Sequence, residues 1–102
     1  MDLKEIINRS VKIREQYHKL ELEYHGSNWS IEEDALAFLT DAGLIGRMTM
    51  DNQGRWPVEN GEEQLKHKLG ECVWWLAVLA NRMNLDLDTC VSEFLDRTEK
   101  KF

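Results

Sequence analysis

Apolar residues recur every three or four positions in four stretches of the chain, which is the spacing of amphipathic helices. No stretch shows the convincing alternation of apolar and polar residues that predicts a strand. The predicted helices run from about Leu3 to Tyr24, from Ser30 to about Met50, from Asn60 to about Met83 and from Asp86 to about Lys101. The sequence therefore predicts an all-α fold, a bundle of about four main helices.

Cap residues mark where these helices begin. The predicted caps are Asp2 with Glu5, Ser30 with Glu33, Asn60 with Glu63, and Asp86. Residues 51–61 contain two of the six glycines and the one proline, which predicts a loop. A loop of this length is long for a connection in a bundle, and such loops are often functional.

The third predicted helix is apolar around its whole circumference between Val73 and Ala80. Such a helix lies at the centre of a bundle or is covered by a partner chain, so we expect a homodimer or a higher homo-oligomer that completes the bundle. The run is far shorter than the roughly 20 residues that cross a bilayer. The first residues also lack the character of a signal peptide, so we expect a cytoplasmic protein with no membrane partner.

Length and composition fit a single domain, residues 1–102, with 42% hydrophobic residues. The formal net charge of −6, with no block of Lys and Arg, argues against nucleic acid as a partner and permits magnesium sites. Cys72 and Cys90 belong to no zinc or disulfide pattern, and we expect both to be small buried hydrophobic residues.

A carboxylate, Glu71, stands inside the apolar segment 69–80, where an ionised acid needs a compensating charge, hydrogen bond or metal. Helical spacing places Asp41 at the edge of the core on the second predicted helix. If the two helices pack antiparallel, Asp41 and Glu71 face each other across a polar notch. Two facing carboxylates suit Mg²⁺ or Mn²⁺. The alternative is that Lys68 or His67, one turn earlier, simply pairs with Glu71.

Other patterns in the sequence are weaker indications of a functional site. His67 and Glu71 have the spacing of two metal ligands on one helix, with a surface histidine as the alternative. His18 and His25 match no zinc pattern and are assigned to a solvated face. The sequence contains no glycine-rich phosphate loop, no HExxH motif and no candidate Ser/His/Asp triad.

The chain reads KLGECVWWL at residues 68–76, LANRMNLDL at residues 79–87 and TDAGL at residues 40–44. These three segments resemble motifs of the MazG-like all-α nucleoside triphosphate pyrophosphohydrolases. Residues 68–76, KLGECVWWL, are similar to the family's Glu-Leu-x-Asp-Val-Leu-Trp-Tyr-Leu. Residues 79–87, LANRMNLDL, are similar to its Leu-Ala-Asn/Asp-x-x-Gly-Ile-Asp-Leu. Residues 40–44 align with its Glu-Glu-x-x-Glu on the second predicted helix. The resemblance covers most of the chain after Trp29.

The resemblance implies a metal-dependent activity. Family members hold Mg²⁺ with these carboxylates and cleave between the α- and β-phosphates to release a nucleoside monophosphate and pyrophosphate. Here the five aligned positions are Thr40, Asp41, Leu44, Lys68 and Glu71. Asp41 and Glu71 remain as candidate metal ligands and catalytic residues, able to hold one Mg²⁺ or Mn²⁺ with water and substrate phosphates. Lys68 either binds phosphate in place of a metal or neutralises Glu71 in an inactive site.

The same resemblance gives further substrate-binding candidates. Trp29 resembles an early tryptophan that stacks on a base, with packing at the helix entry as the alternative. Asn81 aligns with a residue that contacts nucleotide or metal, with a helix cap or an inter-helix hydrogen bond as the alternative. Arg97 and Lys100 resemble a basic last helix near the phosphates, with a solvated helix end as the alternative. Trp56 either closes the long loop over a ligand or anchors that loop.

Two functions are compatible with these residues. The first is a MazG-like nucleotide pyrophosphohydrolase, or a derivative of one, that hydrolyses (d)NTP to (d)NMP and pyrophosphate with Mg²⁺. The second is a catalytically inactive helical dimer that binds a nucleotide or a protein partner. Lys68 and Leu44 favour the second, because Lys68 brings a positive charge where a metal ion is expected and Leu44 cannot coordinate one.

Overall fold

The computed structural model describes residues 1–102 and contains four α-helices and no strand. The helices are α1 (Leu3–His25), α2 (Ile31–Asn52), α3 (Gly61–Arg82) and α4 (Leu87–Glu99). The predicted all-α class is confirmed, and each of the four predicted helices is present. None of the helices combines the length and the apolar character that a membrane crossing requires.

Side chains cap the first two helices as predicted. Asp2 Oδ1 accepts a hydrogen bond from the Glu5 N–H at 2.8 Å, and α1 ends at Gly26, whose φ of 76° lies in the left-handed region that glycine favours. Ser30 and Glu33 form a reciprocal capping box, with N–H donors 3.1 and 2.9 Å from the side-chain oxygens. These caps satisfy backbone donors that the helices leave without partners.

The prediction of a side-chain cap at Asn60 is wrong. Asn60 precedes α3 with a left-handed backbone, φ 57°, and its side chain accepts no hydrogen bond from the first turn. Asparagine is among the few residues that adopt this conformation readily, so its backbone preference explains its position. Asp86 lies at the predicted N-cap of α4, but its carboxylate accepts the hydroxyl hydrogen of Thr89, at 2.7 Å, instead of a backbone N–H.

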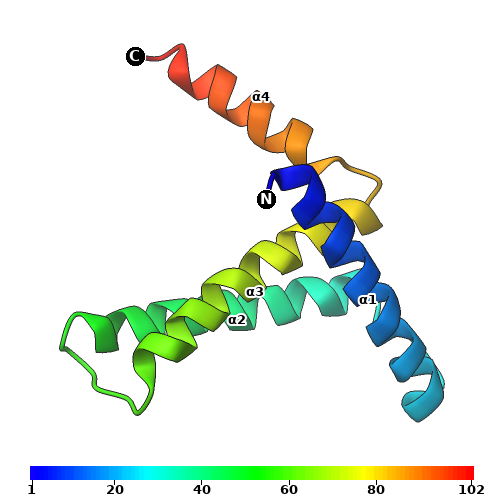
Figure 1. Cartoon of the computed structure of the whole chain (residues 1–102), viewed down its shortest axis with the longest axis horizontal. Coiled ribbons are helices and arrows are strands. Elements are labelled where there is room, and N and C mark those ends of the chain that lie inside the picture. The colour runs from blue at the N-terminus through cyan, green and yellow to red at the C-terminus, as the bar shows by residue number, and fades with distance from the viewer.

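The helices are arranged as a hairpin with two attachments (Figure 1). α2 and α3 run antiparallel and form the most extensive helix pair in the molecule. α1 crosses α3 near the start of α2, whereas α4 leaves the end of α3 and extends away from the hairpin, in contact with α3 and α1 alone. The most deeply buried apolar residues, Ala77 and Val78, lie on α3, which is therefore the central helix.

α3 buries a narrower face than the sequence predicts. Leu69, Leu76 and Met83 belong to the predicted core-facing stripe, yet they are 49%, 43% and 49% exposed. α4 buries no residue at all. Periodicity identifies an apolar face but not the element that covers it, and this chain supplies no element that covers these two faces.

The two cysteines differ in how far they are buried. Cys72 is buried, as expected, and its burial raises the pKa of its thiol, together with the charges of Asp41 and Glu71. Cys90 is exposed on α4, so the prediction that it is buried is wrong. Its neighbours on the helix are exposed for the same reason, because α4 has no covering element within the chain.

The long loop is tied to α2 at the end of the hairpin away from α1 (Figure 1). The guanidinium carbon of Arg47 lies 3.5 Å from the centroid of the Trp56 ring, and Arg47 Nη1 donates to the Trp56 carbonyl at 2.8 Å. Asp51 Oδ1 accepts a hydrogen bond from the Val58 N–H at 2.8 Å. The contacts of Trp56 thus correspond to the anchoring alternative.

Candidate functional site

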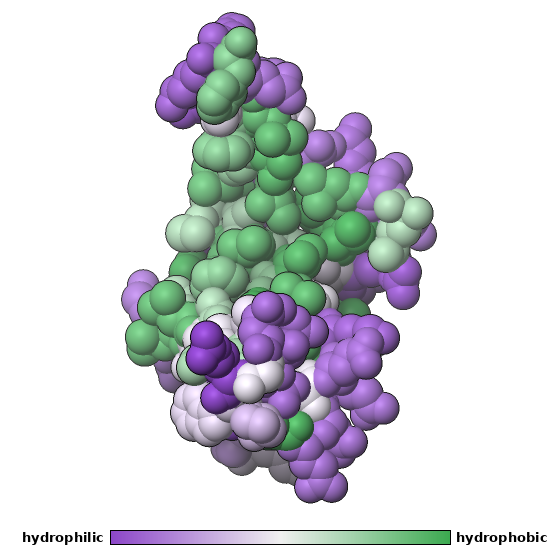
Figure 2. Space-filling view, turned by 90° about the vertical axis from the view of Figure 1, so that its left-hand side faces the viewer, coloured by the Kyte–Doolittle hydropathy of each residue, from purple (hydrophilic) through white to green (hydrophobic).

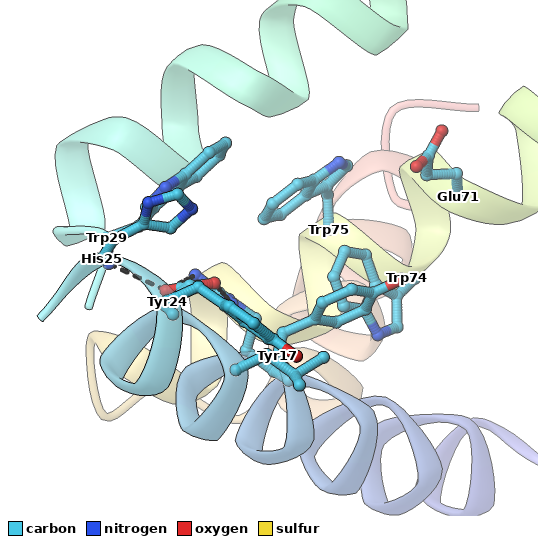
Figure 3. Close-up of a pocket in the computed structure, with 10 residues that line it drawn as sticks. Tyr17, Tyr24, His25, Trp29, Glu71, Trp74 and Trp75 are labelled. Atoms are coloured by element: carbon cyan, nitrogen blue, oxygen red, sulfur yellow. Dashed lines mark hydrogen bonds and ion pairs between the residues drawn. The ribbon is translucent and has the colours of Figure 1, made fainter. Parts of the chain in front are cut away.

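A pocket of about 410 Å³ lies between α1, the turn that leads from α1 to α2, and the middle of α3. We call it the aromatic pocket. Its lining residues are Arg14, Tyr17, Leu20, Glu21, Tyr24, His25, Trp29, Glu71, Trp74 and Trp75. Figure 3 shows Trp29 on one side of the opening and Trp75 on the other, with Tyr17 and Tyr24 extending from α1. Aromatic side chains from α1, from α3 and from the turn between α1 and α2 therefore surround one space.

Hydrogen bonds and ring contacts hold the α3 wall of this pocket in place. Trp74 lies 4.6 Å from Trp75 between ring centroids and makes an edge contact with Tyr17 at 5.9 Å. The indole N–H of Trp74 donates to the Ser10 carbonyl at 3.2 Å, and that of Trp75 donates to Asp41 Oδ2 at 2.8 Å. With both indole N–H groups satisfied, the rings present their apolar faces to the pocket.

A buried network of charges lies next to the aromatic pocket. Asp34 is fully buried and accepts hydrogen bonds from Arg14 Nη2 and from Arg82 Nη1, both at 2.8 Å. Arg14 Nε adds a longer contact to Asp34 at 3.3 Å, and Arg14 Nη1 donates to Glu21 at 2.6 Å. Burial acts to lower the pKa of Arg14, but the hydrogen bonds to Asp34 and Glu21 outweigh it and raise that pKa. Two cations and two carboxylates thus compensate one another away from water.

This network positions Trp29. Glu21 Oε1 accepts a hydrogen bond from the Trp29 N–H at 2.9 Å, and Arg82 Nη1 donates to the Trp29 carbonyl at 3.0 Å. The backbone of Trp29 is therefore held from both sides, while the residue remains 43% exposed and lines the pocket. Sequence reasoning identified Trp29 but missed Arg14 and its pairing with Asp34, although opposite charges on the apolar faces of two predicted helices were a usable signal.

The structure brings Asp41 and Glu71 together as predicted, with Lys68 between them. Lys68 Nζ lies 2.9 Å from Asp41 Oδ1 and 2.8 Å from Glu71 Oε1. His67 Nε2 is 3.9 Å from Glu71 Oε1, which is too long for a hydrogen bond. The contact that the structure shows is therefore the pairing alternative, made by Lys68. We call these three residues the lysine-bridged carboxylates.

The lysine-bridged carboxylates do not fit a divalent cation as they are arranged. Asp41 uses both oxygens, for Lys68 and Trp75, and Glu71 uses one of its two for Lys68. No group of three or more His, Cys, Asp and Glu side chains is placed to hold a metal ion in the molecule. Thr40, at another aligned position, donates its hydroxyl to the Leu36 carbonyl at 3.0 Å. Binding of Mg²⁺ or Mn²⁺ would require Lys68 to move away, and the metal prediction stays a prediction.

The bridging ammonium changes the titration of its partners. Burial acts to raise the pKa of Asp41, but hydrogen bonds from Lys68 and Trp75 outweigh it and lower that pKa. Hydrogen bonds to Glu71 and Asp41 raise the pKa of Lys68 against the effect of burial. The charged forms of Asp41 and Lys68 are therefore both favoured in the folded state.

We expect the stabilisation from Lys68 to depend on pH. Because the pKa of Asp41 is lowered, its ionised form stabilises the fold at pH values above the ordinary carboxyl pKa. This stabilisation is lost as the pH falls below about 4. Because the pKa of Lys68 is raised, its charged form stabilises the fold at pH values below the ordinary lysine pKa. This stabilisation is lost as the pH rises above about 10. Urea unfolding of the wild type and of Lys68→Met should differ most between these limits and converge outside them.

Lys66→Met is the matched control for this measurement. Lys66 is 75% exposed and lies 3.6 Å from Glu62, which is 80% exposed, so its loss should change the free energy of unfolding little at any pH. A constant difference between wild type and Lys68→Met from pH 3 to pH 11 would contradict the bridging role of Lys68.

The remaining candidates lie away from the aromatic pocket. Asn81 lines a separate pocket of about 230 Å³, together with Arg82 and His18. Arg97 and Lys100 lie at the end of α4, which points away from the hairpin (Figure 1). The structure therefore groups Trp29 and Glu71 in one pocket, next to Asp41 and Lys68, and does not bring Asn81, Arg97 or Lys100 to it.

His18 is not on a solvated face, so that expectation is wrong. Its Nε2 atom is buried without a hydrogen-bond partner. Burial lowers the pKa of His18, and the nearby charges of Arg14 and Arg82 lower it further. The position follows from α1 lying across α3, which the sequence of α1 alone does not indicate.

Comparison with protein family models, with curated proteins and with solved structures finds no match for this chain.

Proposed function

We propose that this chain is a nucleotide-binding helical protein that holds a base in the aromatic pocket and does not hydrolyse the phosphates. The observation that carries the proposal is the position of Lys68. Its ammonium group lies 2.9 and 2.8 Å from the two carboxylates of Asp41 and Glu71, where a hydrolase of the resembled family would hold a metal ion. The charge that a divalent cation would supply is thus replaced by a permanent side chain.

The aromatic pocket has the size and lining that a planar base needs. Its volume of about 410 Å³ is within the usual range for small-ligand sites. Stacking of a base on an aromatic side chain contributes about 1–3 kcal/mol. Glu71 lines the pocket and makes no hydrogen bond through Oε2, which leaves an acceptor for an N–H group of the base.

Basic side chains next to the aromatic pocket offer a place for the phosphates. An adjoining pocket of about 420 Å³ shares Tyr17, Glu71 and Trp74 with the aromatic pocket and is also lined by Lys66 and His67. Lys66 and His67 are 75% and 73% exposed, so both are free to turn toward an anion. A phosphate chain leaving the base would reach them without a metal ion.

The resemblance to the MazG-like family supports the choice of a nucleotide as the first ligand to test. The same resemblance makes magnesium-dependent pyrophosphohydrolysis the competing outcome. A further outcome, a protein partner in place of a nucleotide, would leave the aromatic pocket without affinity for any nucleotide.

Replacing Trp29 tests the binding site. We expect Trp29→Ala to weaken nucleotide binding at least tenfold, because one stacking face is lost and an alanine cannot replace it. Isothermal titration calorimetry with ATP, GTP, CTP, UTP and their deoxy forms, in chelator, measures the effect on the dissociation constant.

Trp56→Ala is the matched control for this test. Trp56 is 53% exposed, but it stacks on Arg47 in the long loop and does not line the aromatic pocket. Its loss should leave nucleotide affinity unchanged. Equal weakening by both substitutions, or unchanged affinity in Trp29→Ala with a folded protein by circular dichroism, would contradict the assigned site.

A further inference from the structure

The aromatic pocket combines aromatic rings with carboxylates. Apolar side chains also gather over a broad surface of the molecule (Figure 2), so an apolar lining alone does not distinguish this pocket. Half of its ten lining residues are aromatic, and two more, Glu21 and Glu71, are acidic. Both kinds of side chain attract a positively charged ligand, the rings through their faces and the carboxylates through their charge.

The aromatic rings favour a cation over a neutral ligand of the same shape. The face of an aromatic ring carries partial negative charge, and it attracts a cation that lies within about 6 Å of the ring centroid. Tryptophan is the strongest partner in such contacts. Trp29 and Trp75 lie on opposite sides of the opening (Figure 3), so a ligand that enters between them meets a tryptophan on each side.

The ionic groups around the pocket leave one negative charge uncompensated. In the buried network, the two cations Arg14 and Arg82 balance the two carboxylates of Asp34 and Glu21. In the lysine-bridged carboxylates, one ammonium group faces two carboxylates, so the formal charges of these three side chains leave a net charge of −1. The two clusters together therefore place one net negative charge beside the pocket.

Glu71 brings this charge to the pocket. Its side chain lines the pocket, is 27% exposed, and makes no hydrogen bond through Oε2. Asp41, in contrast, uses both of its oxygens, for Lys68 and Trp75. Lys66 of the adjoining pocket is 75% exposed, so water and salt screen its charge more than they screen Glu71. A positive group in the aromatic pocket thus gains both the carboxylate and the rings.

We propose that the nucleotides bound in the aromatic pocket are those whose base carries a positive charge, that is, a base alkylated on a ring nitrogen. This inference rests on the proposed nucleotide binding and adds the class of base. The ordinary bases are neutral at neutral pH, whereas a methyl group on N1 of adenine or on N7 of guanine leaves the ring positively charged. Stacking on Trp29 and Trp75 then includes a cation–π attraction, and the charge of the base compensates that of Glu71.

Isomeric nucleotides separate the charge of the base from its size. 1-Methyl-ATP and N6-methyl-ATP contain the same heavy atoms, but the base is cationic in the first and neutral in the second. 7-Methyl-GTP and O6-methyl-GTP form a second pair, with the methyl group on a different edge of the ring. We expect the wild type to bind the cationic member of each pair about tenfold more tightly. Isothermal titration calorimetry measures this in chelator and slightly acidic buffer, in which 7-methylguanine keeps its N1 proton.

Glu71→Gln tests the origin of the preference. Glutamine keeps the size of the side chain and removes its charge, so we expect the preference for the cationic isomers to fall about threefold or more, with the rings still favouring a cation. Glu63→Gln is the matched control. It makes the same change of charge on the same helix, but Glu63 is exposed and lines neither pocket, so the preference should stay as in the wild type. Circular dichroism establishes that both variants fold.

The outcomes separate this inference from the proposed function. Equal affinity of the wild type for the two isomers of each pair would overturn the inference and leave nucleotide binding intact. A preference that is as strong in Glu71→Gln as in Glu63→Gln would also overturn the inference, because Glu71 would not be its source. Binding of none of the nucleotides, ordinary or methylated, would overturn the proposed function and the inference together.

Discussion

Replacing Asp34 by asparagine is expected to destabilise the protein by about 3–5 kcal/mol, the largest effect of any polar substitution in this chain. Asp34 is fully buried and carries the negative charge between Arg14 and Arg82. Without that charge, Arg14, itself 5% exposed, would remain buried with Glu21 as its one anionic partner. A loss of this size is a large part of the total stability of a small domain.

Asp96→Asn is the control for this substitution. Asp96 is an exposed residue of α4 with no side-chain hydrogen bond, so its change should alter the free energy of unfolding by less than about 0.5 kcal/mol. Urea unfolding followed by circular dichroism measures both variants. An Asp34→Asn protein as stable as the Asp96→Asn protein would show that the buried network does not stabilise the fold.

Gly61→Ala is expected to have the second large effect on stability. A Cβ at Gly61 would collide with the carboxylate of Asp51 and lie 3.1 Å from a methyl group of Val58. Asp51 cannot simply turn away, because its other oxygen accepts the Val58 N–H at 2.8 Å. We expect a loss of about 1–3 kcal/mol from overpacking, with about 1 kcal/mol more where this hydrogen bond breaks.

Gly70→Ala, on the same helix, should instead raise the stability of the protein. A Cβ at Gly70 meets nothing within 4 Å, and alanine in a helix interior is favoured over glycine by about 0.5–1 kcal/mol. The difference between the two variants in thermal unfolding isolates the steric effect at Gly61. A Gly61→Ala protein at least as stable as wild type would contradict the close approach of α3 to Asp51.

Local signals were sufficient to predict the helices. Ser30 and Glu33 form the capping box that their spacing indicates, and Asp2 caps α1. These interactions join residues three apart, so the sequence contains both partners. The missing side-chain cap at Asn60 and the exposure of Cys90 were not predictable in this way, because the first follows from the left-handed backbone of Asn60 and the second from the absence of a helix that covers α4.

The candidate site was predictable only in part. The antiparallel packing of two helices was enough to predict that Asp41 and Glu71 approach each other, and Lys68 had been identified as one possible partner. The network of Arg14 and Asp34 joins residues 20 positions apart on helices whose crossing the sequence does not specify. The sequence shows opposite charges on the apolar faces of two helices, but tertiary packing decides whether those charges meet.

The ³¹P NMR spectrum of each nucleoside triphosphate with the purified protein tests the central claim most directly. In chelator, we predict shifted or broadened phosphate resonances that show binding. After addition of Mg²⁺, we predict no signals of nucleoside monophosphate or pyrophosphate. Metal-dependent appearance of nucleoside monophosphate and pyrophosphate, abolished by Asp41→Ala or Glu71→Ala, would contradict the account and identify a hydrolase in which Lys68 moves aside. Spectra unchanged by the protein for every nucleotide would contradict the account as well.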